Sequence, residues 1–252
     1  MPTDTAPIQT TATVITSGAE AIRTAREFAA SIADGVIERD RSGPVSAREL
    51  AALDASGLLA ITVPRKYHGA EVPATVLEAP QQFGARAQLV HAAIEVGIAR
   101  GALRDAGEFV RTRARPFFEA ARAGWAPTAR EDPHTIQRYG QLATRVHAAE
   151  ALLAAAAATL DEVTRTPRNA AAAARGSLAV AQAKAFGSEV AAEVASDMFS
   201  LSGASAADER YDLSRHWRNA RTHASHDPVA WKYHHIGNFL LNDVLPPNHG
   251  QI

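Results

Sequence analysis

The amino-acid sequence predicts an all-α protein with a helical N-terminal segment and a C-terminal four-helix bundle. Counting gives 56 alanines in 252 residues, about 22%, and alanine is the best helix former. The aromatic residues typical of strands are sparse, with 8 Phe, 4 Tyr and 3 Trp. Over long stretches, apolar residues recur three, four or seven positions apart, which indicates helices with one buried face.

The N-terminal part contains two stretches that predict helices. Ser17 is placed to cap a first helix that runs to about Val36. A second helix begins at a capping box formed by Ser46 and Glu49. It ends at Gly57, because glycine suits the left-handed position that follows a helix.

The segments around these helices are predicted to be less regular. Residues 1–16, with six Thr and no Lys or Arg, form a flexible tail. Residues 58–63 are expected to be extended and residues 65–70 to form a loop. A short helix over 74–79 ends at Pro80, where a helix cannot continue.

The remainder of the chain predicts antiparallel helices with short connections. The predicted stretches are 85–115, 133–166, one that ends at Gly203, 213–224 and 228–245. Asp132 is an N-cap followed by a proline at the first helical position. The second stretch carries apolar residues at alternating steps of four and three: Leu142, Val146, Ala149, Leu153, Ala156 and Leu160. This pattern and the short connections are typical of a four-helix bundle.

The composition excludes several function classes. With 26 Lys+Arg against 27 Asp+Glu, the net charge of −1 provides no field to hold nucleic acid or an anionic membrane. The absence of cysteine excludes disulfides, thiolate metal sites and cysteine nucleophiles. The longest apolar run, 151–158, is shorter than the roughly 20 residues of a membrane-spanning helix. Because residues 1–16 also lack the features of a signal peptide, we expect a cytoplasmic protein.

The only concentration of chemically versatile side chains is a group of histidines near the C-terminus. Six of the ten His lie between His216 and His249, and no nucleotide-binding or hydrolase motif is present. His223 and His226 bracket the break between the last two predicted helices. Histidine can give or take a proton near neutral pH, so this pair is a candidate catalytic site.

The residues alone leave two other interpretations of this region open. In the first, Asp227 caps the last helix, His223 and His226 bind backbone groups, and the neighbouring Trp and Tyr belong to the core. In the second, His223, His226 and His234 bind a metal, although no matching partner is evident elsewhere. No site role is assigned to three other histidines: His68, His91 and His147.

Three C-terminal tracts resemble a known family: RHWRNARTH (215–223), HDPV (226–229) and WKYH (231–234). They are similar to the C-terminal signature of the sulfur-acquisition oxidoreductases and dibenzothiophene-type monooxygenases. These enzymes are a flavin-dependent branch of the acyl-CoA dehydrogenase superfamily. The resemblance implies that the bundle is like the C-terminal domain of that superfamily.

Further tracts extend the resemblance to about residues 14–79 and 84–252. GL (57–58), ITVP (61–64) and YHGA (67–70) resemble the family's N-terminal helical domain, and HAA (91–93) and GIARGAL (97–103) its first bundle helix. Family members carry a β domain between these two parts, and here that domain is missing. The predicted organisation is a tail over 1–16, a partial N-terminal domain over 17–83 and the bundle over 84–252.

The resemblance implies a flavin-dependent monooxygenase that acts on a small organosulfur compound. Flavin, FMN in preference to FAD, would arrive reduced from a flavin reductase and react with oxygen to a C4a-hydroperoxide. His223 and His226 match the family's catalytic histidine pair, and cofactor-binding roles fall on Gly203, Asn219 and Thr222. No metal is implied.

The resemblance also implies an assembly and one competing function. Relatives form homo-oligomers through the bundle, so a tetramer or dimer is expected. In the acyl-CoA dehydrogenases a catalytic glutamate stands at the position of Asp227, which precedes a proline here and is expected to be a helix cap. The alternative function is a catalytically inactive, internally deleted relative that serves as a helical oligomerisation module.

Overall fold

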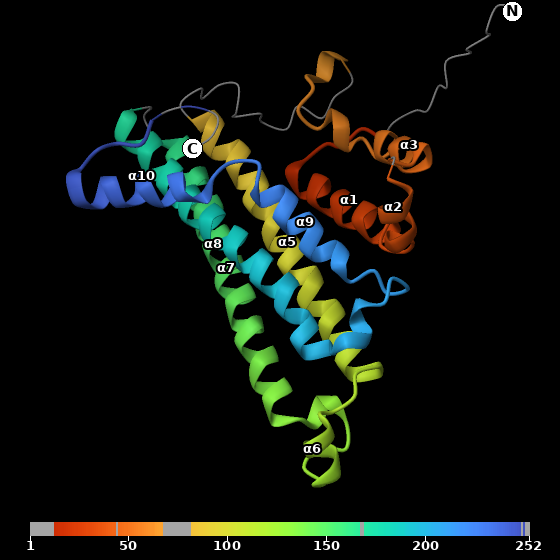
Figure 1. The fold of residues 1–252 in the computed structure, drawn as a ribbon. Coiled ribbons are helices and arrows are strands. Elements are labelled where there is room, and N and C mark those ends of the chain that lie inside the picture. The colour runs from red at the N-terminus through yellow and green to blue at the C-terminus, as the bar shows by residue number, and fades with distance from the viewer. Residues whose placement is uncertain (1–12, 44, 68–81, 167–168, 248, 250–252) are drawn as a thin grey trace, which may run out of the picture. The chain divides into compact units, whose positions relative to one another are not determined.

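The computed structural model describes residues 13–43, 45–67, 82–166, 169–247 and 249. Within these ranges every regular element is helical and no strand occurs, which confirms the predicted all-α fold. The chain divides into two compact units, residues 1–75 and 76–252. Figure 1 shows the elements of both units.

The first unit begins with α1 (Gly18–Ser31), whose predicted cap is confirmed. The Ser17 hydroxyl accepts a hydrogen bond from the Glu20 amide at 3.2 Å. The prediction that this helix continues to Val36 is wrong. Gly35 adopts a left-handed conformation with φ 74°, and a separate helix, α2 (Val36–Ser42), follows it.

The helix α3 (Ala47–Ala55) lies where the sequence predicts it, but its capping box does not form. Ser46 makes no side-chain cap bond, and Glu49 pairs instead with Arg39 at 3.0 Å. Gly57 has the expected left-handed conformation, with φ 77°. A Cβ at this position would lie 1.9 Å from the carbonyl oxygen of Thr13, so only glycine fits.

The prediction that residues 58–63 are extended is wrong. The amides of Ala60, Ile61 and Val63 bond to carbonyl groups three residues earlier, and η1 (Leu58–Ala60) and η2 (Arg65–Tyr67) are 3₁₀ turns. The left-handed Gly57 reverses the chain into these turns, which satisfy the backbone locally. The predicted helix over 74–79 and residues 68–70 of the predicted loop lie outside the described residues.

The second unit contains the predicted bundle. Its helices are α5 (Phe83–Thr112), α6 (Phe118–Arg122), α7 (Pro133–Arg165), α8 (Ala170–Ser202), α9 (Ser214–Ala224) and α10 (Val229–Asn242). Two 3₁₀ turns, η4 (Ala129–Glu131) and η5 (Ala204–Ala207), lie in the connections. The long helices α5, α7 and α8 pack together, and α9 packs on α5 and α8 as the fourth member (Figure 1). The helix α10 turns away from the direction of α9 and packs on α8.

The ends of the long helices follow local sequence rules. The Asp132 carboxylate accepts from the His134 amide at 2.8 Å, which confirms the predicted N-cap of α7. Gly203, with φ 76°, follows the last residue of α8 as predicted.

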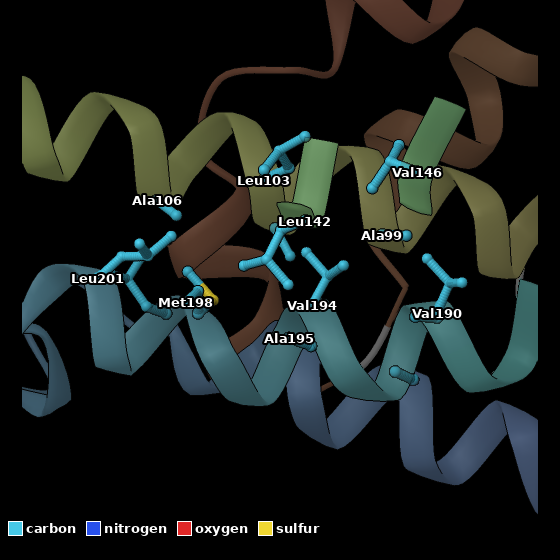
Figure 2. Packing of buried hydrophobic residues seen from close by; sticks show 14 of the residues in the cluster. Ala99, Leu103, Ala106, Leu142, Val146, Val190, Val194, Ala195, Met198 and Leu201 are labelled. Atoms are coloured by element: carbon cyan, nitrogen blue, oxygen red, sulfur yellow. The ribbon is translucent and has the colours of Figure 1, made fainter. Parts of the chain in front are cut away.

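The core of the bundle consists of small and branched side chains between α5, α7 and α8 (Figure 2). Five of the six predicted α7 positions are buried, and Leu153 is partly buried. Gly187 brings α8 close to α5, since a Cβ there would lie 3.3 Å from Val96. Small side chains therefore let α8 approach α5 closely at this position.

No helix within the described ranges has the length and apolar character needed to cross a membrane.

Candidate functional site

The end of α9 and the start of α10 form a corner that carries His223 and His226. His223 lies in the last turn of α9, and His226 lies in the connection between the two helices. The chain breaks here because Pro228 disfavours a helical conformation at the residue before it, Asp227. The break predicted between the two histidines is therefore confirmed.

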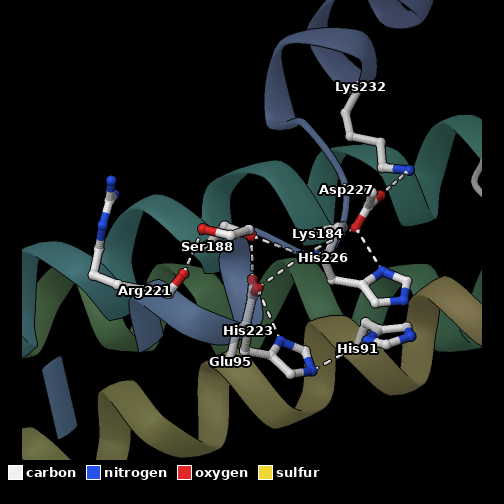
Figure 3. Close-up of polar contacts among 10 residues, drawn as sticks. His91, Glu95, Lys184, Ser188, Arg221, His223, His226, Asp227 and Lys232 are labelled. Carbon is white, nitrogen blue, oxygen red and sulfur yellow. Dashed lines mark hydrogen bonds and ion pairs between the residues drawn. The ribbon is translucent and has the colours of Figure 1, made fainter. Parts of the chain in front are cut away.

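A third histidine, His91 from α5, completes a histidine cluster of His91, His223 and His226 (Figure 3). Nδ1 of His91 lies 3.1 Å from Nε2 of His223. The His91 ring also stacks on the His226 ring, with centroids 4.5 Å apart and an interplanar angle of 29°. The exposed fraction is 51% for the His226 side chain and 19% for that of His223, so the cluster opens to solvent at His226.

Each histidine of the corner faces a carboxylate. Nδ1 of His223 lies 3.1 Å from Oε1 of Glu95, and Nδ1 of His226 lies 3.4 Å from Oδ1 of Asp227. An ionised carboxylate only accepts hydrogen bonds, so this geometry favours the tautomer with the proton on Nδ1 in both rings. In that tautomer, Nε2 of His223 accepts the hydrogen bond from Nδ1 of His91.

Behind the histidines lies a buried ion network of Glu95, Lys184, Ser188, Asp227 and Lys232 (Figure 3). Nζ of Lys184 lies 2.8 Å from Glu95 Oε1, 3.1 Å from Ser188 Oγ and 3.8 Å from Asp227 Oδ1. Nζ of Lys232 lies 2.7 Å from Asp227 Oδ2, and the Ser188 hydroxyl donates to Glu95. Two lysines thus balance two carboxylates, which removes the large cost of burying an unpaired charge.

The surroundings shift the titration of two members of this site. Burial lowers the pKa of His91, and interactions with His226, His223 and Lys184 lower it further. Burial acts to raise the pKa of Asp227, but the hydrogen bond and charge of Lys232, with the charge of Lys184, outweigh it and lower that pKa. At neutral pH, His91 is therefore a neutral ring and Asp227 a carboxylate.

The structure corrects two features of the purely structural interpretation. Asp227 does not cap α10, because the N-cap is Pro228 and no side chain bonds the helix end. Its carboxylate pairs with lysine and histidine side chains instead. Trp231 and Tyr233 are 58% and 45% exposed and do not belong to the core.

The metal interpretation requires His234 beside the corner histidines, and the structure does not bring it there. The His234 ring faces Trp231, with centroids 5.2 Å apart, at a position on α10 beyond the corner. In the described part of the chain, no group of three or more His, Cys, Asp or Glu is arranged to hold a metal ion.

The predicted cofactor-binding residues lie at different distances from the cluster along the chain. Asn219 and Thr222 are exposed on α9, one turn and one residue before His223. Gly203 ends α8, and the connection 204–213 separates it from α9. The structure brings together His223 and His226, and places Asn219 and Thr222 on the turn beside them.

Sequence reasoning missed His91 and all of the buried ion network except Asp227. One signal was available, because His91 and Glu95, like Lys184 and Ser188, are four residues apart and therefore share a helix face. Lys184 lies within the apolar sequence AVAQAKAFG (179–187), and a lysine in such a segment is rarely buried without a partner. Nothing in the sequence, however, indicated that the faces of α5 and α8 meet the corner.

A second polar group ties α9 to α5 away from the histidine cluster. Oδ2 of Asp105 lies 2.8 Å from Nε2 of His216 and also pairs with Arg215. Burial acts to raise the pKa of Asp105, but hydrogen bonds and charge from His216 and Arg104 lower it to about 2. This group holds α9 in place and thereby positions His223 at its end.

Comparison with known proteins identifies the family of the bundle. The family described as Acyl-CoA dehydrogenase, C-terminal domain, matches residues 89–231. The chain therefore belongs to this family. The matched range runs from α5 to the start of α10 and contains the whole histidine cluster.

Curated proteins named as monooxygenases are similar to the chain. A dibenzothiophene monooxygenase from Mycolicibacterium goodii is 39% identical over 166 residues, which are 65% of this chain and 39% of that protein. A probable FMNH2-dependent monooxygenase, SfnC, from Pseudomonas putida is 34% identical over 162 residues, or 64% of this chain and 40% of that protein. The chain thus spans about two fifths of the length of the curated relatives it matches.

Solved structures share the fold of the part of the chain that superposes on them. FMN-bound TdsC from Paenibacillus sp. A11-2 superposes with a TM-score of 0.65 and 31% identity, covering 71% of this chain and 44% of that one. Methanesulfinate monooxygenase MsuC from Pseudomonas fluorescens superposes with a TM-score of 0.65 and 30% identity, covering 69% and 45%.

Proposed function

We propose that the chain is a flavin-dependent oxidoreductase of the monooxygenase type that oxygenates a small organosulfur compound in sulfur acquisition. The observation that carries this proposal is the carboxylate-anchored histidine cluster at the α9–α10 corner. It lies in a chain that is 39% identical over 166 residues to a dibenzothiophene monooxygenase. Reduced FMN, in preference to FAD, would come from a flavin reductase, as the similarity to an FMNH2-dependent monooxygenase and to FMN-bound TdsC supports.

The donor set of the corner fits one wall of a flavin site. His226 is half exposed and bonds Asp227 through Nδ1, so its Nε2 would be the atom that meets a bound flavin. Asn219 and Thr222 are exposed polar residues on the adjoining turns of α9. These groups would hold the polar edge of the ring system, and Gly203 would allow close approach of backbone.

The histidines of this chain would orient the bound group and supply a proton to it. Bound reduced flavin supplies the two electrons with which one oxygen atom of O2 passes to sulfur and the other leaves as water. Nε2 of His226 would accept a hydrogen bond from a bound group, or donate one when the ring is protonated. His223 keeps its proton at Nδ1 through Glu95 and holds His91 through Nε2, so the cluster stays ordered while His226 faces the reaction.

The proposal extends to organisation, assembly and location. Residues 17–83 would correspond to part of the N-terminal domain of the relatives and residues 84–252 to the bundle. The exposed Leu240 and Leu241 on α10, 71% and 83% accessible, favour a homo-oligomer, tetramer or dimer, formed through the bundle. The proposed location is the cytoplasm, where a flavin reductase would supply reduced flavin.

A second function is favoured by one observation. Fifteen residues separate η2 from α5, too few for the β domain of the relatives, and the described residues contain no strand. A flavin on the corner would then be open to water on one side. On this basis the chain would be an internally deleted, inactive relative that serves as an oligomerisation module.

Flavin titration distinguishes the two functions. FMN and FAD are titrated by calorimetry into the full chain, into His226→Ala and into His147→Ala, an exposed histidine of α7 that serves as the control. The proposed enzyme binds FMN, His147→Ala binds it equally, and His226→Ala binds it more weakly. No binding of either flavin up to about 1 mM, where binding is worth only about 4 kcal/mol, contradicts the enzymatic function.

A further inference from the structure

The two candidate catalytic histidines are anchored on different carboxylates, and one lysine contacts both. Glu95 from α5 anchors His223, and Asp227 from the corner anchors His226. Nζ of Lys184 lies 2.8 Å from Glu95 and 3.8 Å from Asp227. Its side chain has no exposed surface, so it contacts neither solvent nor a ligand.

Burying Lys184 costs free energy, and the fold alone does not require a lysine at this position. Burying an ammonium group costs several kcal/mol unless its partners are well placed, and apolar side chains of similar volume often stabilise a core as well or better. Apart from Ser188, the buried residues of α8 next to Lys184 are alanine, valine and glycine, which would accept an apolar residue. The lysine therefore has a use other than packing.

Lys184 keeps Glu95 and Asp227 ionised, and in that form both groups only accept hydrogen bonds. A carboxylate that only accepts hydrogen bonds forces the proton of a neighbouring imidazole onto the nitrogen that faces it. Without Lys184, Glu95 and Asp227 would be two buried negative charges with Lys232 as the remaining cation of the network. The proton that balances this charge would be shared between the two carboxyl groups, and each carboxyl group, while protonated, is a donor that no longer defines the tautomer of its histidine.

We propose that Lys184 is a positioning residue for both His223 and His226. It holds the two carboxylates as acceptors, so both rings keep their proton on Nδ1 and turn Nε2 away from the network. The charged and titratable groups that face the pair are His91 and Glu95 from α5, Lys184 from α8, and Asp227 and Lys232 from the α10 side. The use of Lys184 in catalysis rests on the proposed function, but its effect on the two tautomers does not.

The structure also defines what the fixed tautomers do. Nε2 of His223 accepts from Nδ1 of His91, which leaves Nε2 of His91 as the terminal acceptor of a chain that begins at Glu95. His226 stacks on the His91 ring, so its orientation depends on its own bond to Asp227 and on the chain from Glu95 through His223 to His91. The single buried cation, Lys184, thereby keeps both histidines in one arrangement.

The experiment is nitrogen-15 NMR of the histidine rings in the full chain, without flavin, at about pH 8, above the ordinary titration range of imidazole. The chemical shifts of Nδ1 and Nε2 report which nitrogen carries the proton, and His223→Gln and His226→Gln assign the signals. Lys184→Met removes the shared cation at similar length. Lys232→Met is the matched control, since Lys232 is equally buried and pairs with Asp227 from α10.

In the unsubstituted chain both rings are expected as the Nδ1–H tautomer. Lys184→Met should give tautomer mixtures at both His223 and His226, whereas Lys232→Met should alter His226 and leave His223 unchanged. The proposal is overturned if Lys184→Met changes one ring or neither. It is also overturned if the unsubstituted chain shows Nε2–H tautomers at the pair.

A second comparison covers the case in which Lys184→Met does not fold. Glu95→Gln removes one buried charge, and Glu95→Gln with Lys184→Met removes a balanced pair, so the double variant carries no unpaired charge at this point. Both variants should alter His223, which loses its carboxylate, and both should leave His226 as the Nδ1–H tautomer, because Lys232 still balances Asp227 in the double variant. An altered His226 in the double variant refutes the proposal. Since no flavin is present, failure of FMN to bind in a separate titration contradicts the proposed function and leaves this result standing.

Discussion

Removing His223 should mainly lower the stability of the fold, whereas removing His226 should mainly weaken ligand binding. His223 is 19% exposed and makes two contacts at 3.1 Å, with Glu95 and with His91. His223→Ala leaves a buried carboxylate without one of its donors, which costs about 2 kcal/mol in the free energy of unfolding. For a chain of this size that loss lowers Tm by about 4–8 °C.

His226 differs because its side chain is 51% exposed and its one ionic contact, with Asp227, is 3.4 Å long. Exposed contacts of this kind contribute between about 0 and 1 kcal/mol, so His226→Ala should lower Tm by no more than about 4 °C. If His226 serves a bound flavin, the same change should weaken FMN binding by about tenfold, which corresponds to about 1.4 kcal/mol.

Calorimetric melts and FMN fluorescence titrations of the two variants measure both effects. A fall in Tm after His226→Ala that equals the fall after His223→Ala would refute the assignment of His226 to the ligand side. Unchanged FMN affinity in His226→Ala, together with a normal melt, would refute its role in binding.

Three other outcomes are expected. Leu142 is fully buried in the bundle, so Leu142→Ala should lower the free energy of unfolding by about 3 kcal/mol in urea denaturation, and an unmoved midpoint would place this face of α7 in solvent. The pKa of Asp105, about 2 against 3.8 in the unfolded chain, means that its carboxylate stabilises the fold above about pH 4 and that this contribution is lost as the pH falls towards 2. In Asp105→Asn the acid-dependent part, about 1 kcal/mol after allowance for solvent screening, should be absent from pH-dependent melts. Light scattering at tens of micromolar should show an oligomer that Leu240→Asp with Leu241→Asp reduces in size, whereas a monomer before substitution would contradict self-association.

The sequence by itself determined the elements of the bundle. Asp132 before Pro133, the steps of four and three through α7, and Gly203 after α8 are local features whose physical effect acts within a few residues. The same rules failed in the first unit where a tertiary partner competed. Glu49, for example, pairs with Arg39 instead of closing its capping box, because an ion pair with another helix replaced a local bond.

The histidine cluster shows what only the tertiary structure decided. The C-terminal histidines and the break between α9 and α10 were evident in the sequence, but the partners of His223 lie 128 and 132 residues earlier in the chain. Hydrophobic spacing predicts which side of a helix is buried, but it does not predict how two helices are shifted along each other. The packing of α5, α8 and α9 sets that shift, and it brings His91, Glu95 and Lys184 to the corner where proton positions are defined.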